Sequence, residues 1–202
     1  MNYNNNDIII AQSTPVGSSA IAVIRVSGLS LAGLLPVLFK NKKIKPRYSY
    51  TLQFVGFESK ILIDTCVIVY YKAPSSFTGE DMLEISCHGN SLIIEKIINE
   101  FIAKGIRVAY PGEFSYRAFQ NNKIDLMQAE SIAEKITLNS DTYGVALQNI
   151  ENGTTSKRFE HLKSSVLNTL SIVEHELDFN EEEITHLDVS VIKNDFIKIQ
   201  KE

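Results

Sequence analysis

The sequence predicts an α+β domain, with a mostly antiparallel sheet and flanking helices, followed by an all-α segment. Two observations support this class. Strand-like runs separated by short turns dominate residues 1–118, and short connections of this kind join antiparallel strands. From Leu126 onward, apolar residues recur at helical spacing with almost no strand signal. We therefore predict two domains, residues 1–118 and residues 119–202.

The composition is that of a folded protein, with 44% hydrophobic and 22% charged residues. No apolar run approaches the ~20 residues that span a bilayer, and the first residues lack the features of a secretory signal. We expect a cytoplasmic protein that does not associate with membranes. Cys66 and Cys87 lie in apolar runs without CxxC spacing, so we expect buried reduced thiols rather than a disulfide or a metal site.

The net charge of −4 is unevenly distributed. Residues 1–118 hold 12 Lys/Arg against 9 Asp/Glu, whereas residues 119–202 hold 8 against 15. The acidic second part is therefore a poor candidate for contact with a phosphate backbone. The first part has no dense basic stripe, and its Lys-rich piece 40–45 is expected to be a solvated connector.

The first domain is expected to contain six strands and two helices. The strand candidates are apolar or alternating runs at 7–11, 20–26, 48–57, 60–71, 82–88 and 106–109. A helix is expected from Ser30 to Phe39, although Pro36 argues for a break or an early end. The clearer helix is Ser91–Lys104, with apolar residues at 3.6 spacing and Gly105 as its C-cap.

The second domain is expected to be helical over 128–137 and over about 141–178, with Gly144 and Gly153 as weak points. The long helix carries an apolar stripe of residues three or four apart: Phe159, Leu162, Val166, Leu170, Val173 and Leu177. Such a stripe indicates packing against other helices. The acidic run 180–184 predicts a solvated turn rather than a metal site. Because the sequence ends within a helical pattern, we expect a fragment of a longer protein.

The stretch from Ser76 to Gly89 carries the most suggestive polar pattern. A turn with Gly79 at positive φ is expected to lead into a strand. In that strand Leu83, Ile85 and Cys87 share one face, and Met82, Glu84, Ser86 and His88 share the other. A carboxylate, a hydroxyl and an imidazole on one face indicate the wall of a site, although a half-buried strand with a wet outer face explains them equally well.

Three cations add to this pattern. Arg25 is set in an apolar strand and needs an anion or acceptors, which a structural ion pair would supply as well as a ligand. Arg117 and Lys123 lie near the domain boundary. One strand carboxylate plus separated cations suits a ligand with a donor-rich ring, such as a pterin, and carboxylates at its other end.

No motif for nucleotide hydrolysis, metal binding or nucleophilic catalysis occurs. The phosphate-binding pattern GxxxxGK[ST] is absent. Residues 152–157 have some of its letters in the wrong order and are expected in the middle of a helix. We therefore assign no catalytic residue and no metal ligand.

Several motifs occur together in a fixed order: IIAQSTP (9–15), IRVSG (24–28), SFTGED (76–81), HG (88–89), PGEFS (111–115), RAF (117–119), KIDL (123–126) and QAE (128–130). With this series the chain resembles the MnmE (TrmE) family of tRNA-modification GTPases, from about residue 7 to about residue 185. The resemblance implies a tetrahydrofolate-binding and dimer-forming domain with the fold of glycine-cleavage T proteins. It also implies the first part of a helical domain, ending before an inserted Ras-like GTPase domain.

The resemblance further implies a ligand and its contacts. The ligand is 5-formyl- or 5,10-methylene-tetrahydrofolate, bound by Arg25, Glu84 and Lys123. From the polar pattern described above we add Ser86, His88 and Arg117 as supporting residues. GTP, Mg and K belong to the GTPase domain, so no GTPase activity is expected of this chain. In the family, the full enzyme acts as a homodimer with the FAD protein MnmG. Together they add a carboxymethylaminomethyl-type group to carbon 5 of the wobble uridine of tRNA.

The chain departs from the family's usual pattern, and two other interpretations remain. The loop Val16–Ser19 lacks the family's usual Gly/Arg-rich composition, so no cationic contribution is expected from it. The chain could serve only as a dimerisation platform that does not bind folate. It could also be a stand-alone folate-dependent aminomethyl transferase, against which the helical second part argues.

Overall fold

The computed structural model describes residues 6–40, 42–137, 148–150, 152–178, 193–194, 196–197 and 200. The chain forms two compact units, Met1–Ile124 and Asp125–Glu202. The first contains the sheet and the second is helical in its described part. None of the described helices is long and apolar enough to cross a membrane.

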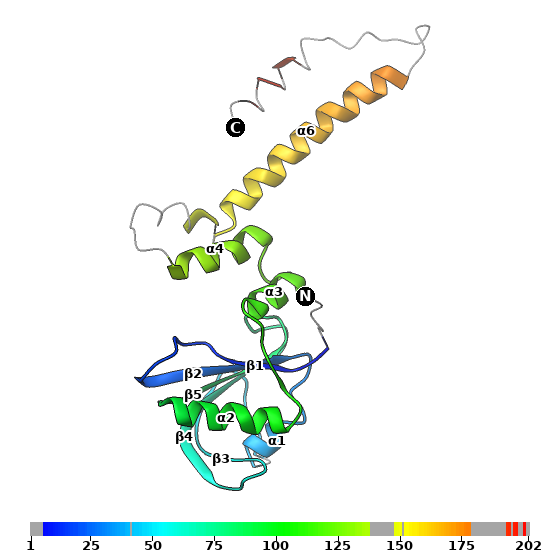
Figure 1. Ribbon diagram of the computed structural model, residues 1–202. Coiled ribbons are helices and arrows are strands. Elements are labelled where there is room, and N and C mark those ends of the chain that lie inside the picture. The colour runs from blue at the N-terminus through cyan, green and yellow to red at the C-terminus, as the bar shows by residue number, and fades with distance from the viewer. Residues whose placement is uncertain are drawn as a thin grey trace. The chain divides into compact units, whose positions relative to one another are not determined.

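The first unit is built on a six-stranded sheet of order β3-β4-β5-β2-β1-β6 (Figure 1). Its strands are β1 (Ile9–Gln12), β2 (Ser19–Gly28), β3 (Ser49–Val55), β4 (Leu62–Tyr71), β5 (Asp81–Gly89) and β6 (Arg107–Val108). Five of them pair antiparallel, and β6 pairs parallel to β1. The predicted α+β class is confirmed, with one parallel pair that makes the sheet mixed.

One face of the sheet is covered by α2 (Ser91–Ala103), which packs against β5, β1 and β4 (Figure 1). Asn90 caps this helix, because its side-chain oxygen accepts from Leu92 N at 2.9 Å. Gly105 follows its end at φ +82°, as the predicted C-cap requires. The buried residues of α2 include Ile94, Ile97 and Phe101, which join the core.

The core consists of alternate strand residues that face α2. Its central members are Ala22, Ile24 and Val26 of β2, Cys66, Ile68 and Tyr70 of β4, and Leu83, Ile85 and Cys87 of β5. The predicted inward face of β5 is thereby confirmed. Both thiols are buried and free, and burial raises the pKa of Cys66 to about 12 and that of Cys87 to about 11.

The helix expected from Ser30 is shorter than predicted. Only α1 (Leu35–Leu38) is helical, and Pro36 lies in its first turn. A proline is tolerated there because the first helical N–H groups have no partner within the helix. The proline therefore marks the start of this helix and does not interrupt a longer one.

The helix α3 (Glu113–Gln120) follows Gly112, which has φ +76°. Arg117 of α3 is 1% exposed and forms salt bridges to three carboxylates that are far apart in sequence. They are Asp7 before β1, Glu80 before β5 and Glu113 one helical turn away. Its Nη1 also donates to Asp7 O at 2.9 Å. We call these four side chains the Arg117 cluster.

The carboxylates of the Arg117 cluster have further donors. Arg107 of β6 donates to Glu113 from both terminal nitrogens, at 2.7 and 3.0 Å, and to Asp7 at 2.8 Å. Ser27 of β2 donates to Glu80 at 2.8 Å. Burial alone would raise the pKa of Glu113, but the bonds from Arg107, Tyr110 N and Arg117 outweigh it and hold that pKa below its usual value.

The Arg117 cluster explains where the first unit ends. The unit extends to Ile124, six residues beyond the predicted boundary, which falls inside α3. Asn121, after α3, also donates to Thr78 O at 2.7 Å. These bonds tie α3 and the turn that follows it to the sheet.

The second unit contains α4 (Leu126–Thr137) and α6 (Thr154–Asp178). The predicted weak point at Gly153 is confirmed, since this residue has φ +68° and α6 begins directly after it. Residues 152–157 therefore lie at the start of a helix and not in its middle. On the predicted stripe, Phe159, Val166 and Leu170 are 46 to 59% exposed. Gly144, the acidic run 180–184 and the terminal helical pattern lie largely or wholly outside the described residues.

We predict that Arg117→Met destabilises the first unit by about 3 kcal/mol, because the substitution leaves buried carboxylates without their counterion. Amide hydrogen exchange at Ile24 and Ile85 measures this, and the slowest rates should rise about 100-fold. Arg158→Met on the exposed surface of α6 is the matched control and should change them little. Equal effects of the two substitutions would contradict a structural role for the cluster.

Candidate functional site

The sheet register places Arg25 and Glu84 directly opposite each other on β2 and β5. The same row continues to Val69 of β4 and, on the other side, to Ala11 of β1. All four side chains therefore project from the face opposite the α2-covered core. The sequence placed Arg25 and Glu84 on separate strands, and the structure brings them into contact.

Both oxygens of the Glu84 carboxylate are held by neighbours. Arg25 reaches Oε1 from Nε at 2.8 Å and from Nη2 at 2.7 Å. Tyr71, at the end of β4, donates its hydroxyl to Oε2 at 3.1 Å. Burial, together with the negative charge of Glu84, raises the pKa of Tyr71, so this hydroxyl keeps its proton. The carboxylate is thereby fixed in position while retaining unused lone pairs.

An aromatic side chain borders this pair on the loop before β5. The ring of Phe77 lies 5.5 Å from the Arg25 guanidinium carbon, a cation–π distance. Arg47 stands over the ring of Tyr71 at 5.8 Å and donates to Ser75 O at 2.9 Å. The side chains of Arg25 and Glu84 remain 31% and 23% exposed. The pair is therefore accessible from solvent at the edge of an aromatic wall.

Lys123, in the turn after α3, contacts the same loop. Its Nζ donates to Pro74 O at 3.1 Å. A Cβ added to Gly79 would lie 3.1 Å from Lys123 Cγ and 3.0 Å from Asn121 Cβ. With φ +79° as well, this position suits glycine alone. The loop Pro74–Gly79 thus has contacts with Lys123 and, through Phe77, with Arg25.

Ser86 and His88 continue the Glu84 face of β5 away from this loop. Ser86 is half-buried, with Val23 and Val67 opposite it on the neighbouring strands. His88 is exposed, and its ring Nδ1 lies 2.7 Å from Asp64 Oδ1. Burial would raise the pKa of Asp64, but hydrogen bonds from the backbone N–H and ring of His88 outweigh it and lower that pKa. Glu84, Ser86 and His88 therefore form a continuous polar row on the outer face of β5.

Arg117, predicted as a supporting site residue, lies in the buried Arg117 cluster. Its guanidinium is engaged by three carboxylates and is almost inaccessible. The structure gives it a positioning task, since Glu80 and Thr78 belong to the loop that carries Phe77. The charge of Arg117 is therefore used inside the protein.

Tyr71 and Phe77 are the site residues that the sequence analysis missed. Phe77 was part of the SFTGED motif but was not assigned a function. Tyr71 has the parity of Val67 and Val69 along β4, which places it on the outer face. That alternation was the available signal, but it gave no indication that β4 would pair beside Glu84.

The arrangement can bind a planar polar ligand. Glu84 can accept two neighbouring N–H donors, Phe77 and Tyr71 offer aromatic surface, and Arg25 and Lys123 offer positive charge. Val23 and Val69 give the face an apolar floor beside Glu84. In the described part of the chain no group of three metal-ligating side chains comes together. The site is suited to binding.

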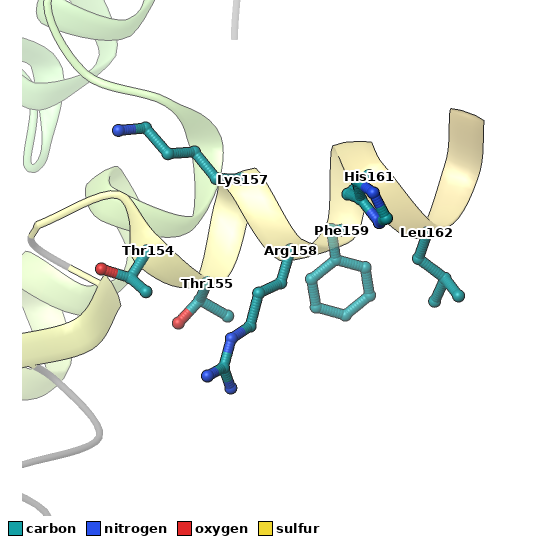
Figure 2. A pocket seen from close by; sticks show the side chains of 7 residues that line it. All are labelled: Thr154, Thr155, Lys157, Arg158, Phe159, His161 and Leu162. Carbon is teal, nitrogen blue, oxygen red and sulfur yellow. The ribbon is translucent and has the colours of Figure 1, made fainter. Parts of the chain in front are cut away.

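A cavity of about 690 Å³ lies elsewhere, at the start of α6. Its lining residues are Thr154, Thr155, Lys157, Arg158, Phe159, His161 and Leu162 (Figure 2). All come from two turns of one helix, and Lys157 points away from the others. None of the predicted site residues belongs to it. We therefore assign the candidate site to the sheet face and not to this hollow.

Comparison with known proteins gives one family and a consistent set of relatives. A family model described as "GTP-binding protein TrmE N-terminus" matches residues 8–123. The tRNA modification GTPase MnmE of Aquifex aeolicus is 42% identical over 89% of this chain and 40% of its own length. Those of Fervidobacterium nodosum and Legionella pneumophila (strain Corby) are 42% and 40% identical, over 43% and 40% of their lengths. The chain thus spans about two fifths of these relatives.

We predict that the Arg25–Glu84 pair contributes little to stability, because both groups are partly exposed. A double-mutant cycle with Arg25→Gln and Glu84→Gln should give a coupling energy of about 1 kcal/mol or less. Urea unfolding of each variant, monitored by amide hydrogen exchange, measures the free energies of unfolding from which the coupling energy is calculated. A coupling of about 3 kcal/mol or more would identify the pair as a structural bridge like those of buried ions.

Proposed function

The chain belongs to the TrmE N-terminus family, and on that premise we propose that it is the folate-binding and dimer-forming part of a tRNA-modification GTPase. One observation carries the proposal. Arg25 and Tyr71 hold the Glu84 carboxylate on an accessible sheet face, beside aromatic rings and within a domain whose loop also contacts Lys123. Of these residues, Arg25, Glu84 and Lys123 are the three folate contacts that the family resemblance implies.

The residues present fit a pterin with a carboxylate tail. Glu84 can accept from the adjacent N–H and NH₂ groups of the pterin, an arrangement that favours a fixed carboxylate. Arg25 orients that carboxylate, and Tyr71 restricts its rotation. Within the described part of the chain, the Lys123 ammonium donates to a backbone carbonyl, and it can also bind a carboxylate of the ligand. A bound 5-formyl- or 5,10-methylene-tetrahydrofolate would supply a one-carbon unit.

We extend the proposal to the whole protein as follows. The relatives named above are tRNA modification GTPases more than twice as long as this chain. Nucleotide hydrolysis, with its GTP, Mg and K, would belong to a part beyond the residues that resemble the folate domain. The complete enzyme would act in the cytoplasm with the FAD protein MnmG on the wobble uridine of tRNA.

We predict that the chain binds 5-formyltetrahydrofolate in isothermal titration calorimetry and that Glu84→Ala weakens binding at least about 100-fold. The loss of two hydrogen bonds to a charged group accounts for this magnitude. Glu95→Ala removes an exposed carboxylate on α2 and is the matched control, for which affinity should not change. Undetectable binding by the unsubstituted chain would leave only the dimerisation function.

The homodimer is a separate part of the proposal. Ile21 and Val67, 62% and 39% exposed, lie on the same sheet face as Glu84. Apolar side chains exposed together favour association. Sedimentation velocity at several protein concentrations should show a dimer, and Val67→Glu should shift it toward the monomer. Lys96→Glu, on the exposed surface of α2, is the control. A strict monomer at every concentration would contradict the dimer.

A further inference from the structure

The structure has a cluster of cations immediately before β3 that the candidate site does not use. It consists of Lys40, Lys42, Lys43, Lys45 and Arg47, which we call the basic segment. We propose that the basic segment and Tyr48 form a contact surface for the phosphate backbone and a base of RNA. The proposal rests on the function proposed above, since tRNA would be the RNA concerned.

The basic segment is unusually rich in positive charge. It holds five of the chain's 20 Lys and Arg residues within eight positions, and no acidic residue lies among them. All five side chains are exposed. The overall charge of −4 is therefore a poor guide to this surface, because phosphate binding responds to local charge.

None of these cations is neutralised by the described part of the protein. No described carboxylate lies within 4.0 Å of any of them. By contrast Arg25, Arg107 and Arg117 each have a carboxylate partner in the same unit. These three arginines are neutralised by carboxylates and the five cations of the basic segment are not, so the segment is electrostatically suited to an anionic partner.

The backbone of the basic segment is fixed to the domain. Lys42 N donates to Phe39 O at 3.0 Å, and Lys45 N donates to the Tyr50 hydroxyl at 2.8 Å. Arg47 N donates to Tyr70 O at 2.7 Å. The expected solvated connector is thus held at two points against the sheet and at a third by the end of α1. A held segment loses less entropy when a partner binds than a free one does.

An aromatic side chain lies among the cations. Tyr48 is 59% exposed, and the Lys45 ammonium lies 5.6 Å from its ring centroid. Exposed rings among basic side chains are how proteins stack single-stranded bases while binding the backbone. This feature favours RNA over an acidic protein. A lipid surface is disfavoured, because the one aliphatic residue between Lys42 and Arg47, Ile44, is half-buried.

The basic segment adjoins the proposed folate site. Arg47 lies over Tyr71, which donates to Glu84, and it also donates to Ser75 O on the loop that carries Phe77. An RNA bound along this segment would pass beside the residues that hold the one-carbon donor. That placement is what the transfer of a carbon unit to a nucleoside requires.

The test measures binding of an in vitro tRNA transcript by fluorescence anisotropy between about 50 and 200 mM salt. The triple variant Lys42→Gln, Lys43→Gln, Lys45→Gln should bind at least about tenfold more weakly at low salt. The slope of log affinity against log salt should fall by about 2, since each lost phosphate contact contributes about 0.7. Tyr48→Ala should weaken binding about tenfold and leave the slope unchanged.

The matched control is Lys96→Gln, Lys157→Gln, Lys163→Gln, which removes the same charge from three scattered exposed positions. Its affinity should stay within about twofold of the original. Equal losses of tRNA affinity in the two triple variants would overturn the proposal, and so would the absence of tRNA binding at low salt. The proposal would also be overturned if the Lys42, Lys43, Lys45 triple lost binding to phosphatidylserine vesicles but kept its binding to tRNA. Folate calorimetry on the same variants is independent, so a failed folate site and a failed RNA surface are distinguishable.

Discussion

One buried guanidinium organises the first unit. Arg117 joins Asp7, before the first strand, to Glu80, before β5, and to Glu113 on its own helix. A charge taken out of water must be compensated fully, so these segments have little freedom once it is in place. The loop before β5 and the turn after α3 are fixed by it. Phe77 and Lys123 lie on those two segments, and thus the geometry of the candidate site depends on a residue that does not reach the site.

The ionic interactions of this unit fall into two kinds. Those between Arg117, Glu80 and Glu113 are buried, with side chains 0 to 3% exposed. The Arg25–Glu84 pair keeps part of its surface in water. A partly exposed pair exchanges partners at low energetic cost, whereas a buried one does not. Buried ion pairs suit a structural role, and partly exposed ion pairs suit a site where a ligand binds and dissociates.

Local patterns in the sequence predicted most of the fold. The alternation along β5, the amphipathic spacing of α2 and the punctuation by Gly105 and Gly153 are properties of short segments, and the structure follows them. Contacts between distant segments were not predictable. Arg25 and Glu84 are 59 residues apart, and their pairing depends on the register of β2 against β5. The same limit applies to Tyr71 beside Glu84, and to Arg117, whose buried partners come from three places. The effect of Pro36 was also not predictable from the sequence. Whether a proline starts or breaks a helix depends on where the first turn of that helix falls.

The two cysteines have a practical consequence. Their thiols lie inside the sheet core, and burial raises both pKa values by two or more units above the usual value. At neutral pH almost no thiolate is present to react with an alkylating dye. A cysteine introduced on the surface would therefore be the one that is labelled in the folded chain. The native sequence needs no prior removal of cysteines before a spectroscopic probe is attached beside Glu84 or Tyr48.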